Sequence, residues 1–584
     1  MSQSNSPREG SISQIRLELG NETETNVESS KEVNLQLLAR SGGDEKIVKT
    51  KQCWPKVAAV LFGGALVSTM ALILLLIAKD GGLAQKNKGR AESKSDEPIN
   101  VIFMISDGFG PASETLARQY YQTMNGLKVN WRSPLDEMLV GSSRTQSSDS
   151  LITDSAAGAT AFSCGLKSYN GAIGVTDDKR PCGTILEAAK KKGMYTGLVS
   201  TSRITHATPG SFAAHVIDRN MEDLIAEYLI GNYSLGRTVD LMLGGGYCKF
   251  VPSTEMNGCR MDNRNLLKEA INNKGFNVIQ TRKEFEQLEH RLPLLGLFTA
   301  SHMNYEIDRE KLKEPSLAEM TEKALSILKK QSKRDETSFF VMIEGSRIDM
   351  AAHSNDPAAH LQDILAYWKA IDVSKQFVNA NPNTVLISVS DHETGGVTLA
   401  RQLNKEYPEY LWNPHVLHNV KNSSETVSKY LYNIDSDIPT ISSYKLKYDL
   451  LKSTILPKWY GIKDYTEEEV VNLANTTDIV ELRQHLSDLV STRAQIGWST
   501  HGHSAVDVNL YAYGYKASQL RGNVENTDVG KFVKDILSLD LDYISKIIAN
   551  DPVSQKTGYR ADKWQGRDLS RLDLVDVDAI VHRF

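Results

Sequence analysis

Three apolar runs of the sequence each lead into an acidic side chain. The acids are Asp107, Glu344 and Asp391, and the runs before them span 99–105, 339–343 and 384–390. Continuous apolar runs of this length are typical of strands buried on both faces of a parallel sheet. Because neighbouring parallel strands end at the same edge, we expect the three carboxylates to lie close together. Their mutual repulsion predicts that cations bind between them.

Histidines with suitable spacing accompany these acids. Asp349 and His353 are four residues apart, so on a helix they share one face and both can bind one ion. His392 directly follows a strand-end acid, and His503 or His501 offers a further nitrogen. Mixed Asp and His ligands suit zinc, whereas Asp, Glu and Thr oxygens suit magnesium. Each pair alone is more typical of a helix surface or a turn, but together they indicate a multi-metal phosphoryl-transfer site.

The candidate nucleophile is a serine at the predicted start of a helix. Ser155 follows Asp154, which can cap the helix, and precedes small residues at 156–161. In a first helical turn, unpaired N–H groups and the helix dipole favour an anion. By itself the segment favours an ordinary alanine-rich core helix. The acids and histidines elsewhere make Ser155 a candidate for attack on phosphorus.

The elements that must position these residues alternate along the chain. Further strands are predicted at 196–200, 239–243 and 506–514, and helices at 316–331 and from Asp356 to about Val378. This alternation predicts an α/β fold with a mostly parallel sheet. The region 399–497, rich in Tyr and Asn, is predicted to be an insertion.

Length and charge limit the functions to consider. The chain has 584 residues and a net charge of −5. It has room for one large α/β domain, predicted at 98–545, and a C-terminal extension at 546–584. No basic stripe is interleaved with aromatic residues, which argues against nucleic acid as a partner.

An uncharged apolar run between Lys56 and Lys79 predicts a transmembrane helix. Such a helix would rise roughly 33 Å, enough to cross a bilayer core of about 30 Å. The run starts too far from Met1 for a cleavable signal peptide, so we predict a signal anchor at 56–79. A disordered tail at 1–55 precedes it and a polar stalk at 80–97 follows it.

The flanking lysines and arginines are balanced, so they leave the orientation of the anchor open. Glycosylation sequons favour a lumenal C-terminal domain and a cytosolic tail, although one sequon lies in the tail. In that tail, Glu32 with Leu37 and Leu38 loosely matches a signal for a sorting adaptor. The sequons are Asn21, Asn232, Asn422 and Asn475.

Five cysteines are present, and Cys53 lies beside the predicted anchor. The other four form an even set. Local disulfides Cys164–Cys182 and Cys248–Cys259 are one arrangement, and buried free thiols are the other.

The motifs at 105–108, 153–161, 344–353 and 391–396 resemble those of the alkaline phosphatase family, and the resemblance covers about 100–514. With its anchor, the chain is most similar to the vacuolar (repressible) membrane-anchored enzymes of yeasts. The resemblance implies a broad-specificity phosphomonoesterase with an alkaline optimum that forms a phosphoserine. It also implies a central mixed sheet flanked by helices on both faces, and a homodimer with two zinc ions and one magnesium ion per subunit. The expected location is the vacuole membrane, as a single-pass type II protein with a lumenal catalytic domain.

The family pattern assigns a role to each motif residue. The first zinc would be bound by Asp349, His353 and His503, the second by Asp107, Asp391 and His392, and the magnesium by Asp107, Thr208 and Glu344. Ser155 would be the nucleophile and Arg219 would bind two phosphate oxygens. The gap-free spacing from His503 to Gly514 favours His503 over His501 as the ligand.

Two positions depart from parts of the family. Met350 stands where many members carry Lys or His directed at the phosphate, which puts phosphate affinity in question. His206 matches the animal enzymes, and we expect it beside the magnesium without binding it.

Two alternatives accompany this interpretation. A phosphodiesterase or sulfatase relative would share the two-metal core, but Arg219 and Glu344 favour monoesters. A membrane-anchored scaffold with a vestigial site is disfavoured because every expected ligand is present.

Overall fold

The computed structural model describes residues 97–437 and 440–550. The predicted tail, anchor and most of the stalk lie outside these residues, as does the chain after residue 550. Among the described helices, none combines the length and apolar character needed to cross a bilayer.

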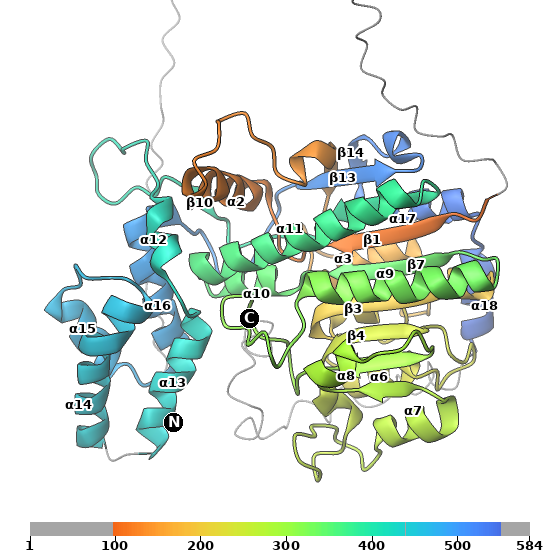
Figure 1. Cartoon of the computed structure of the whole chain (residues 1–584), viewed down its shortest axis with the longest axis horizontal. Coiled ribbons are helices and arrows are strands. Elements are labelled where there is room, and N and C mark those ends of the chain that lie inside the picture. Colours follow the sequence, from red (N-terminus) through yellow and green to blue (C-terminus); the bar gives the residue numbers. More distant parts are fainter. Residues whose placement is uncertain (1–96, 438–439, 551–584) are drawn as a thin grey trace, which may run out of the picture. The chain divides into compact units, whose positions relative to one another are not determined.

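A ten-stranded sheet forms the centre of the described domain (Figure 1). Its order is β14-β2-β13-β8-β1-β7-β3-β4-β6-β5. β13 is antiparallel to both of its neighbours, β2 and β8, and all other pairs are parallel. The prediction of a mostly parallel, mixed sheet is therefore confirmed. The strands are β1 (Asn100–Ile105), β2 (Leu139–Arg144), β3 (Tyr195–Arg203), β4 (Leu241–Gly245), β5 (Asn277–Ile279), β6 (Leu294–Leu297), β7 (Phe339–Glu344), β8 (Thr384–Val389), β13 (Val508–Gly514) and β14 (Gly522–Glu525).

The central strand β1 shows why its sequence is continuously apolar. Ile102 and Met104 pack into the core on one face of the sheet, while Val101, Phe103 and Ile105 pack into the core on the other. Since successive side chains of a strand point to opposite faces, a strand covered on both sides needs an apolar residue at every position.

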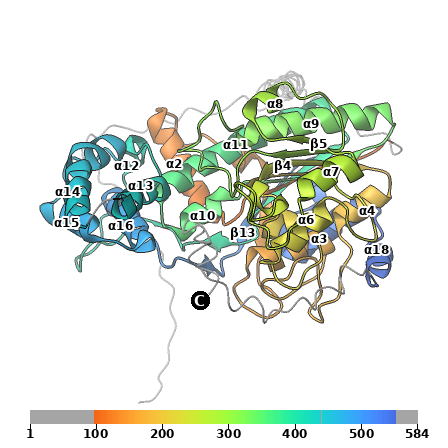
Figure 2. The same cartoon turned by 90° about the horizontal axis from the view of Figure 1, so that it is seen from below.

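Helices cover both faces of the sheet (Figures 1 and 2). One face carries α2 (Pro111–Met124), α8 (Arg282–Glu286), α9 (Leu317–Arg334) and α11 (Pro357–Ala380). The other carries α3 (Ser155–Cys164), α4 (Ile185–Lys191), α6 (Glu222–Leu229), α7 (Leu266–Lys274), α17 (Asn526–Leu537) and α18 (Leu541–Ile548). Caps fix the predicted starts of the long helices: Ser316 and Glu319 form a capping box on α9, and Asp356 accepts two backbone N–H bonds at α11. α18 continues past the predicted domain boundary at residue 545.

The predicted insertion is a group of helices beside one end of the sheet (Figure 1). A short antiparallel pair, β10 (Thr398–Leu399) and β11 (Ile496–Gly497), joins its two ends. Its members are α12 (Pro414–Asn419), α13 (Ser424–Asp437), α14 (Thr440–Leu450), the π-helix η3 (Leu451–Trp459), α15 (Glu467–Asn475) and α16 (Ile479–Ala494).

Two local disulfides cross-link the catalytic part of the chain. They are Cys164–Cys182 and Cys248–Cys259, the first of the two arrangements considered from the sequence.

Candidate active site

Ser155 is the first residue of α3, next to the residue that caps the helix. The Asp154 carboxylate accepts a hydrogen bond from Ala157 N at 2.9 Å, which satisfies one of the unpaired donors of the first turn. Ser155 is buried, and its Oγ lies 3.1 Å from His392 Nε2. Gly158 permits this approach, because a Cβ there would lie only 3.0 Å from the Asp391 side chain.

One group of possible metal ligands consists of Asp349, His353 and His503, whose ligand atoms lie within 4.8 Å of one another. The first two lie one turn apart on α10 (Arg347–His353), and His503 begins the short strand β12 (His503–Ser504). His503 Nδ1 contacts Thr153 O at 2.8 Å, which leaves Nε2 3.2 Å from His353 Nε2. His501 lies outside the group, with its Nδ1 2.8 Å from His353 O.

A second group surrounds the end of β1. Asp107, Asp349 and His392 have ligand atoms within 4.8 Å of one another. Asp391 adjoins this group, with its Oδ2 3.4 Å from His392 Nε2. Among the described residues, neither carboxylate oxygen of Asp107 has a hydrogen-bond partner, and neither does Oδ2 of Asp391. Buried carboxylate oxygens that accept no hydrogen bond are typical of side chains that bind a metal ion.

The third group consists of Asp107, His206 and Glu344. The predicted ligand Thr208 is fully buried, and its hydroxyl has no hydrogen-bond partner among the described residues. Burial raises the pKa of Glu344, and the neighbouring Ser346 and Thr208 hydroxyls lower it only in part. His206, which we expect beside the magnesium without binding it, is a member of this group. Its Nε2 is also 3.1 Å from Arg219 Nη2, so the ring links this group to the predicted phosphate-binding residue.

The electrostatics of these groups support cation binding. Burial, followed by the charges of Asp391, Asp349 and Glu344, raises the pKa of Asp107 well above its ordinary value. Burial and the charges of Asp349 and Glu344 raise the pKa of Asp391 to about 8. Burial would also raise the pKa of Asp349, but neighbouring imidazoles lower it below its ordinary value. A cation would stabilise the ionised form of all these carboxyls, so the donor set fits metal ions.

Arg219 is 8% exposed and is held by the helix cap of α3. Its Nη1 donates to Asp154 Oδ2 at 3.1 Å, while Gly171 N donates to the same oxygen at 3.0 Å. Asp154 therefore both caps α3 and orients the guanidinium. The sequence predicts only the capping role. Asp154 and Arg219 are far apart along the chain, and no sequence pattern indicates their contact.

Two further residues, Thr394 and Met350, adjoin Asp349 of the first group of possible metal ligands. Thr394 donates from Oγ1 to Asp349 Oδ1, which fixes the carboxylate, and only its place in the 391–396 motif signalled it. Met350 packs with Tyr305 and Ala359 in a small apolar cluster, and its Sδ lies 3.0 Å from Arg347 Nη1. Met350, which departs from the family pattern, therefore packs in the apolar cluster behind α10.

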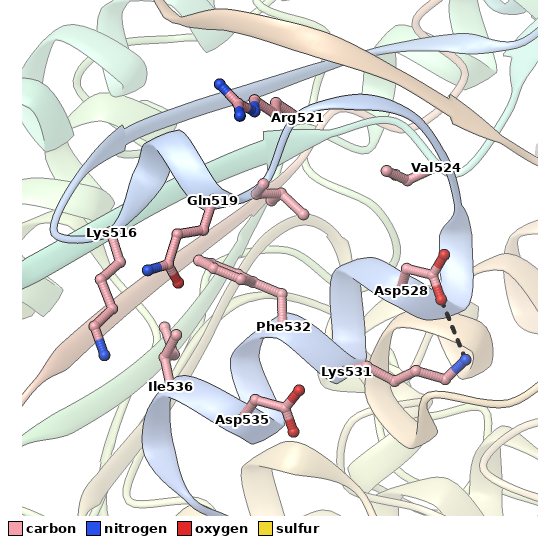
Figure 3. Close-up of a pocket in the computed structure, with 10 residues that line it drawn as sticks. Lys516, Gln519, Arg521, Val524, Asp528, Lys531, Phe532, Asp535 and Ile536 are labelled. Atoms are coloured by element: carbon pink, nitrogen blue, oxygen red, sulfur yellow. Dashed lines mark hydrogen bonds and ion pairs between the residues drawn. The ribbon is translucent and has the colours of Figure 1, made fainter.

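An open groove elsewhere on the domain contains none of the predicted site residues. Figure 3 shows it between the turn at Lys516–Arg521 and α17, where Lys531 forms an ion pair with Asp528 at 3.2 Å. Its lining mixes apolar residues such as Phe532 and Ile536 with charged ones such as Lys516 and Asp535. The chemistry of the domain lies at the three ligand groups and not in this groove.

Known proteins are similar to this chain over most of its length. The family model for alkaline phosphatase matches residues 99–539. An alkaline phosphatase of Schizosaccharomyces pombe is 47% identical over 485 residues, covering 82% of this chain and 89% of the relative. The repressible alkaline phosphatase of Saccharomyces cerevisiae is 46% identical over 506 residues, covering 83% and 89%. This chain belongs to the alkaline phosphatase family and is a metal-dependent phosphomonoester hydrolase.

Solved structures agree with this assignment. The alkaline phosphatase of Thermus thermophilus is 30% identical with a TM-score of 0.64, covering 79% of this chain and 95% of that one. The cold-active enzyme of a Shewanella species is 29% identical with a TM-score of 0.63, covering 75% and 100%. A variant of the enzyme from the Antarctic bacterium TAB5, solved with magnesium bound, is 27% identical with a TM-score of 0.53, covering 76% and 99%.

Proposed function

We propose that Ser155 is the nucleophile that takes the phosphoryl group from the substrate. The observation that carries this proposal is the position of its Oγ, buried at the capped start of α3 and 3.1 Å from His392 Nε2. His392 belongs to the second ligand group, which shares Asp349 with the first group and Asp107 with the third.

We further propose the metal content expected from the family resemblance. Asp349, His353 and His503 would bind one zinc ion. Asp107, Asp391 and His392 would bind a second, and Asp107, Thr208 and Glu344 the magnesium, with His206 adjoining. Support comes from carboxylate oxygens of Asp107, Asp391 and Glu344 that have no hydrogen-bond partner among the described residues, and from the magnesium in the TAB5 variant. When bound, the metals lower the pKa of the serine hydroxyl, neutralise the leaving oxygen and activate water.

Arg219, Asp154 and Ser155 each have a separate role in the reaction. Arg219 donates two hydrogen bonds to phosphate oxygens, and Asp154 holds its guanidinium in position. Ser155 Oγ forms a bond to phosphorus while the bond from phosphorus to the ester oxygen breaks and the alcohol leaves. Water then attacks the phosphoserine, which releases phosphate and restores the hydroxyl.

The test is the Ser155→Ala variant of the metal-loaded enzyme, with Ser163→Ala on the same helix as control. Ser163 is buried and contacts Thr160 O at 3.4 Å, away from the ligand groups. Turnover of p-nitrophenyl phosphate should fall by about 10³-fold or more in Ser155→Ala, with zinc content unchanged and no labelled phosphoenzyme. Labelling of Ser155→Ala at wild-type stoichiometry would refute the assignment.

Chelation and alternative substrates test the reaction class. A chelator should abolish turnover, and zinc with magnesium should restore it. The wild-type enzyme should prefer p-nitrophenyl phosphate over bis-p-nitrophenyl phosphate and p-nitrophenyl sulfate. A preference for the diester or the sulfate would instead favour a phosphodiesterase or sulfatase.

We also propose that the enzyme is a type II protein of the vacuole membrane with a lumenal catalytic domain. Support comes from the apolar run at 57–78, from the two disulfides, which suit an oxidising compartment, and from the exposed sequon Asn475 at the end of α15. A sorting adaptor would bind the tail. The family resemblance supports a homodimer, which light scattering of the solubilised enzyme would test.

A further inference from the structure

The loop that follows β6 places a half-buried histidine, His302, next to the third ligand group. Its backbone lies against the ends of two strands of the sheet. Met303 N donates to Thr201 O of β3 at 3.0 Å. Directly after β4, Gly246 N donates to Ser301 O at 2.8 Å. These two hydrogen bonds, one on each side of His302, fix where its side chain begins.

The ring of His302 packs against the ring of His206. The two rings meet edge to face, with their centroids 5.3 Å apart and an angle of 82° between their planes. This is a favoured arrangement of two aromatic rings. Because His206 Nε2 lies 3.1 Å from Arg219 Nη2, His302 is one contact behind the predicted phosphate-binding guanidinium.

Arg203 fixes the edge of the His302 ring. Its Nη1 lies 2.7 Å from His302 Nε2, and its backbone N lies 3.3 Å from His302 Nδ1. Its Nε donates to Glu222 at 2.9 Å, and both of these side chains are buried. Burial alone would raise the pKa of Glu222, but Arg203 and Lys249 lower it below its ordinary value. The carboxylate therefore stays ionised and holds Arg203 against His302.

Arg219 is thus supported on both of its terminal nitrogens. Asp154 accepts from Nη1 at 3.1 Å, and His206 contacts Nη2. An arginine side chain has several rotatable bonds, so a guanidinium that must donate to two oxygens of one phosphate binds more weakly when it is free to turn. Asp154 is fixed as the cap of α3, whereas His206 has the His302 ring behind it.

We propose that His302 is a positioning residue for phosphate binding, which holds His206 and, through it, the guanidinium of Arg219. His302 belongs to none of the three ligand groups. The proposal rests on the proposed role of Arg219 as the residue that binds phosphate oxygens. Because Arg219 would contact the phosphoryl group and not the alcohol, His302 should affect all phosphomonoesters alike.

Calorimetry of inorganic phosphate binding to the zinc- and magnesium-loaded enzyme tests the proposal. His302→Ala should weaken binding by about threefold to tenfold, as expected for the loss of one aromatic contact. For p-nitrophenyl phosphate, KM should rise by a similar factor while kcat stays within about twofold of wild type, whereas a merely structural loss would lower kcat. His290→Ala, at a half-buried histidine that contacts Ser326 at 3.3 Å, should bind phosphate as wild type does. Unchanged phosphate affinity in His302→Ala would overturn the proposal.

A double-mutant cycle determines whether His302 acts through His206. In a His206→Ala background, adding His302→Ala should weaken phosphate binding by less than about twofold. The same loss in both backgrounds would show that His302 acts by another route and would overturn the proposal. His302→Phe keeps a ring against His206, so it should bind phosphate within about twofold of wild type. A loss in His302→Phe as large as in His302→Ala would contradict positioning by the ring.

Arg219→Ala separates this proposal from the proposed function on which it rests. It should weaken phosphate binding more than His302→Ala does, because it removes the donor itself. Unchanged binding in Arg219→Ala would refute the role of Arg219. Weakened binding in Arg219→Ala together with normal binding in His302→Ala would refute the role of His302 alone.

Discussion

His503 and His501 lie two residues apart, but only the ring of His503 faces Asp349. We expect His503→Ala to lose one zinc ion and at least about a hundredfold in turnover, because two remaining ligands hold an ion poorly. His501→Ala should keep its zinc and lose about tenfold or less, because this ring only supports the chain beside His353. Elemental analysis after dialysis, together with turnover, measures both effects. Zinc lost from His501→Ala and kept in His503→Ala would reverse the assignment.

Glu114 should make the protein less stable as the pH rises. Burial raises its pKa to about 8, although hydrogen bonds from Ser133 and Trp368 lower it in part. In the unfolded chain its pKa is about 4.3, so between these values the folded state binds a proton that the unfolded state has lost. The contribution to stability is therefore complete below about pH 4.3 and is lost as the pH rises through about 8.

Glu114→Gln tests this effect, because the amide is neutral at every pH. Its stability relative to wild type should increase with pH by up to about 1.4 kcal/mol per unit and level off above about pH 8. Denaturant unfolding from pH 5 to 9 at fixed metal concentration measures the difference. Glu137→Gln, an exposed neighbour paired with Lys375, should show no such trend. Parallel curves for Glu114→Gln and wild type would count against the shifted pKa.

Single residues differ in how far the sequence reveals their roles. Asp349 and His353 were predicted to share a helix face because their spacing is local, and α10 places them so. The Asp154–Arg219 ion pair was not predicted, because it depends on how α3 and the chain around 219 meet in space. Met350 was considered for its effect on phosphate binding, but its direction depends on the apolar cluster behind α10.

At the scale of elements, the cap of α3 combines two roles that substitutions can separate. Asp154→Asn keeps an acceptor for Ala157 N but loses the charge that binds Arg219. It should bind phosphate more weakly and lose about 1 kcal/mol of stability, because its NH2 group cannot accept from Gly171 N. Asp154→Ala should lose about 1 kcal/mol more, because it also removes the cap. Denaturant unfolding and inhibition by inorganic phosphate measure the two roles. Equal destabilisation by both substitutions would show that the cap depends on charge.

The strands that the sequence predicted are those with continuous apolar runs, such as β1, β7 and β8. β2 and β14 were not predicted, because β14 is the edge strand, β2 lies next to it, and both leave much of their length exposed or half-buried. Their residues lack the pattern of a strand covered on both faces. The sequence also did not predict that β13 runs antiparallel to β2 and β8, since strand direction depends on the connections between strands and not on their composition.

At the scale of the whole molecule, we predict a cytosolic tail and a lumenal catalytic domain. Protease added to sealed vacuolar vesicles should remove only the tail, because the bilayer shields the domain. Detergent should then expose the domain to the protease, which serves as the control. Digestion of the domain in intact vesicles would reverse the orientation.

The ligands of the first group come from widely separated parts of the chain, with His503 far beyond Asp349 and His353. A ribosome delivers the chain from its N-terminus, so the serine and the acids at the ends of β1, β7 and β8 emerge long before His503. A nascent chain that stops before residue 503 would contain Ser155, the proposed nucleophile, but only two of these three proposed ligands. Catalytic competence therefore arises only near the end of the domain's synthesis, and truncated products of translation should be inactive.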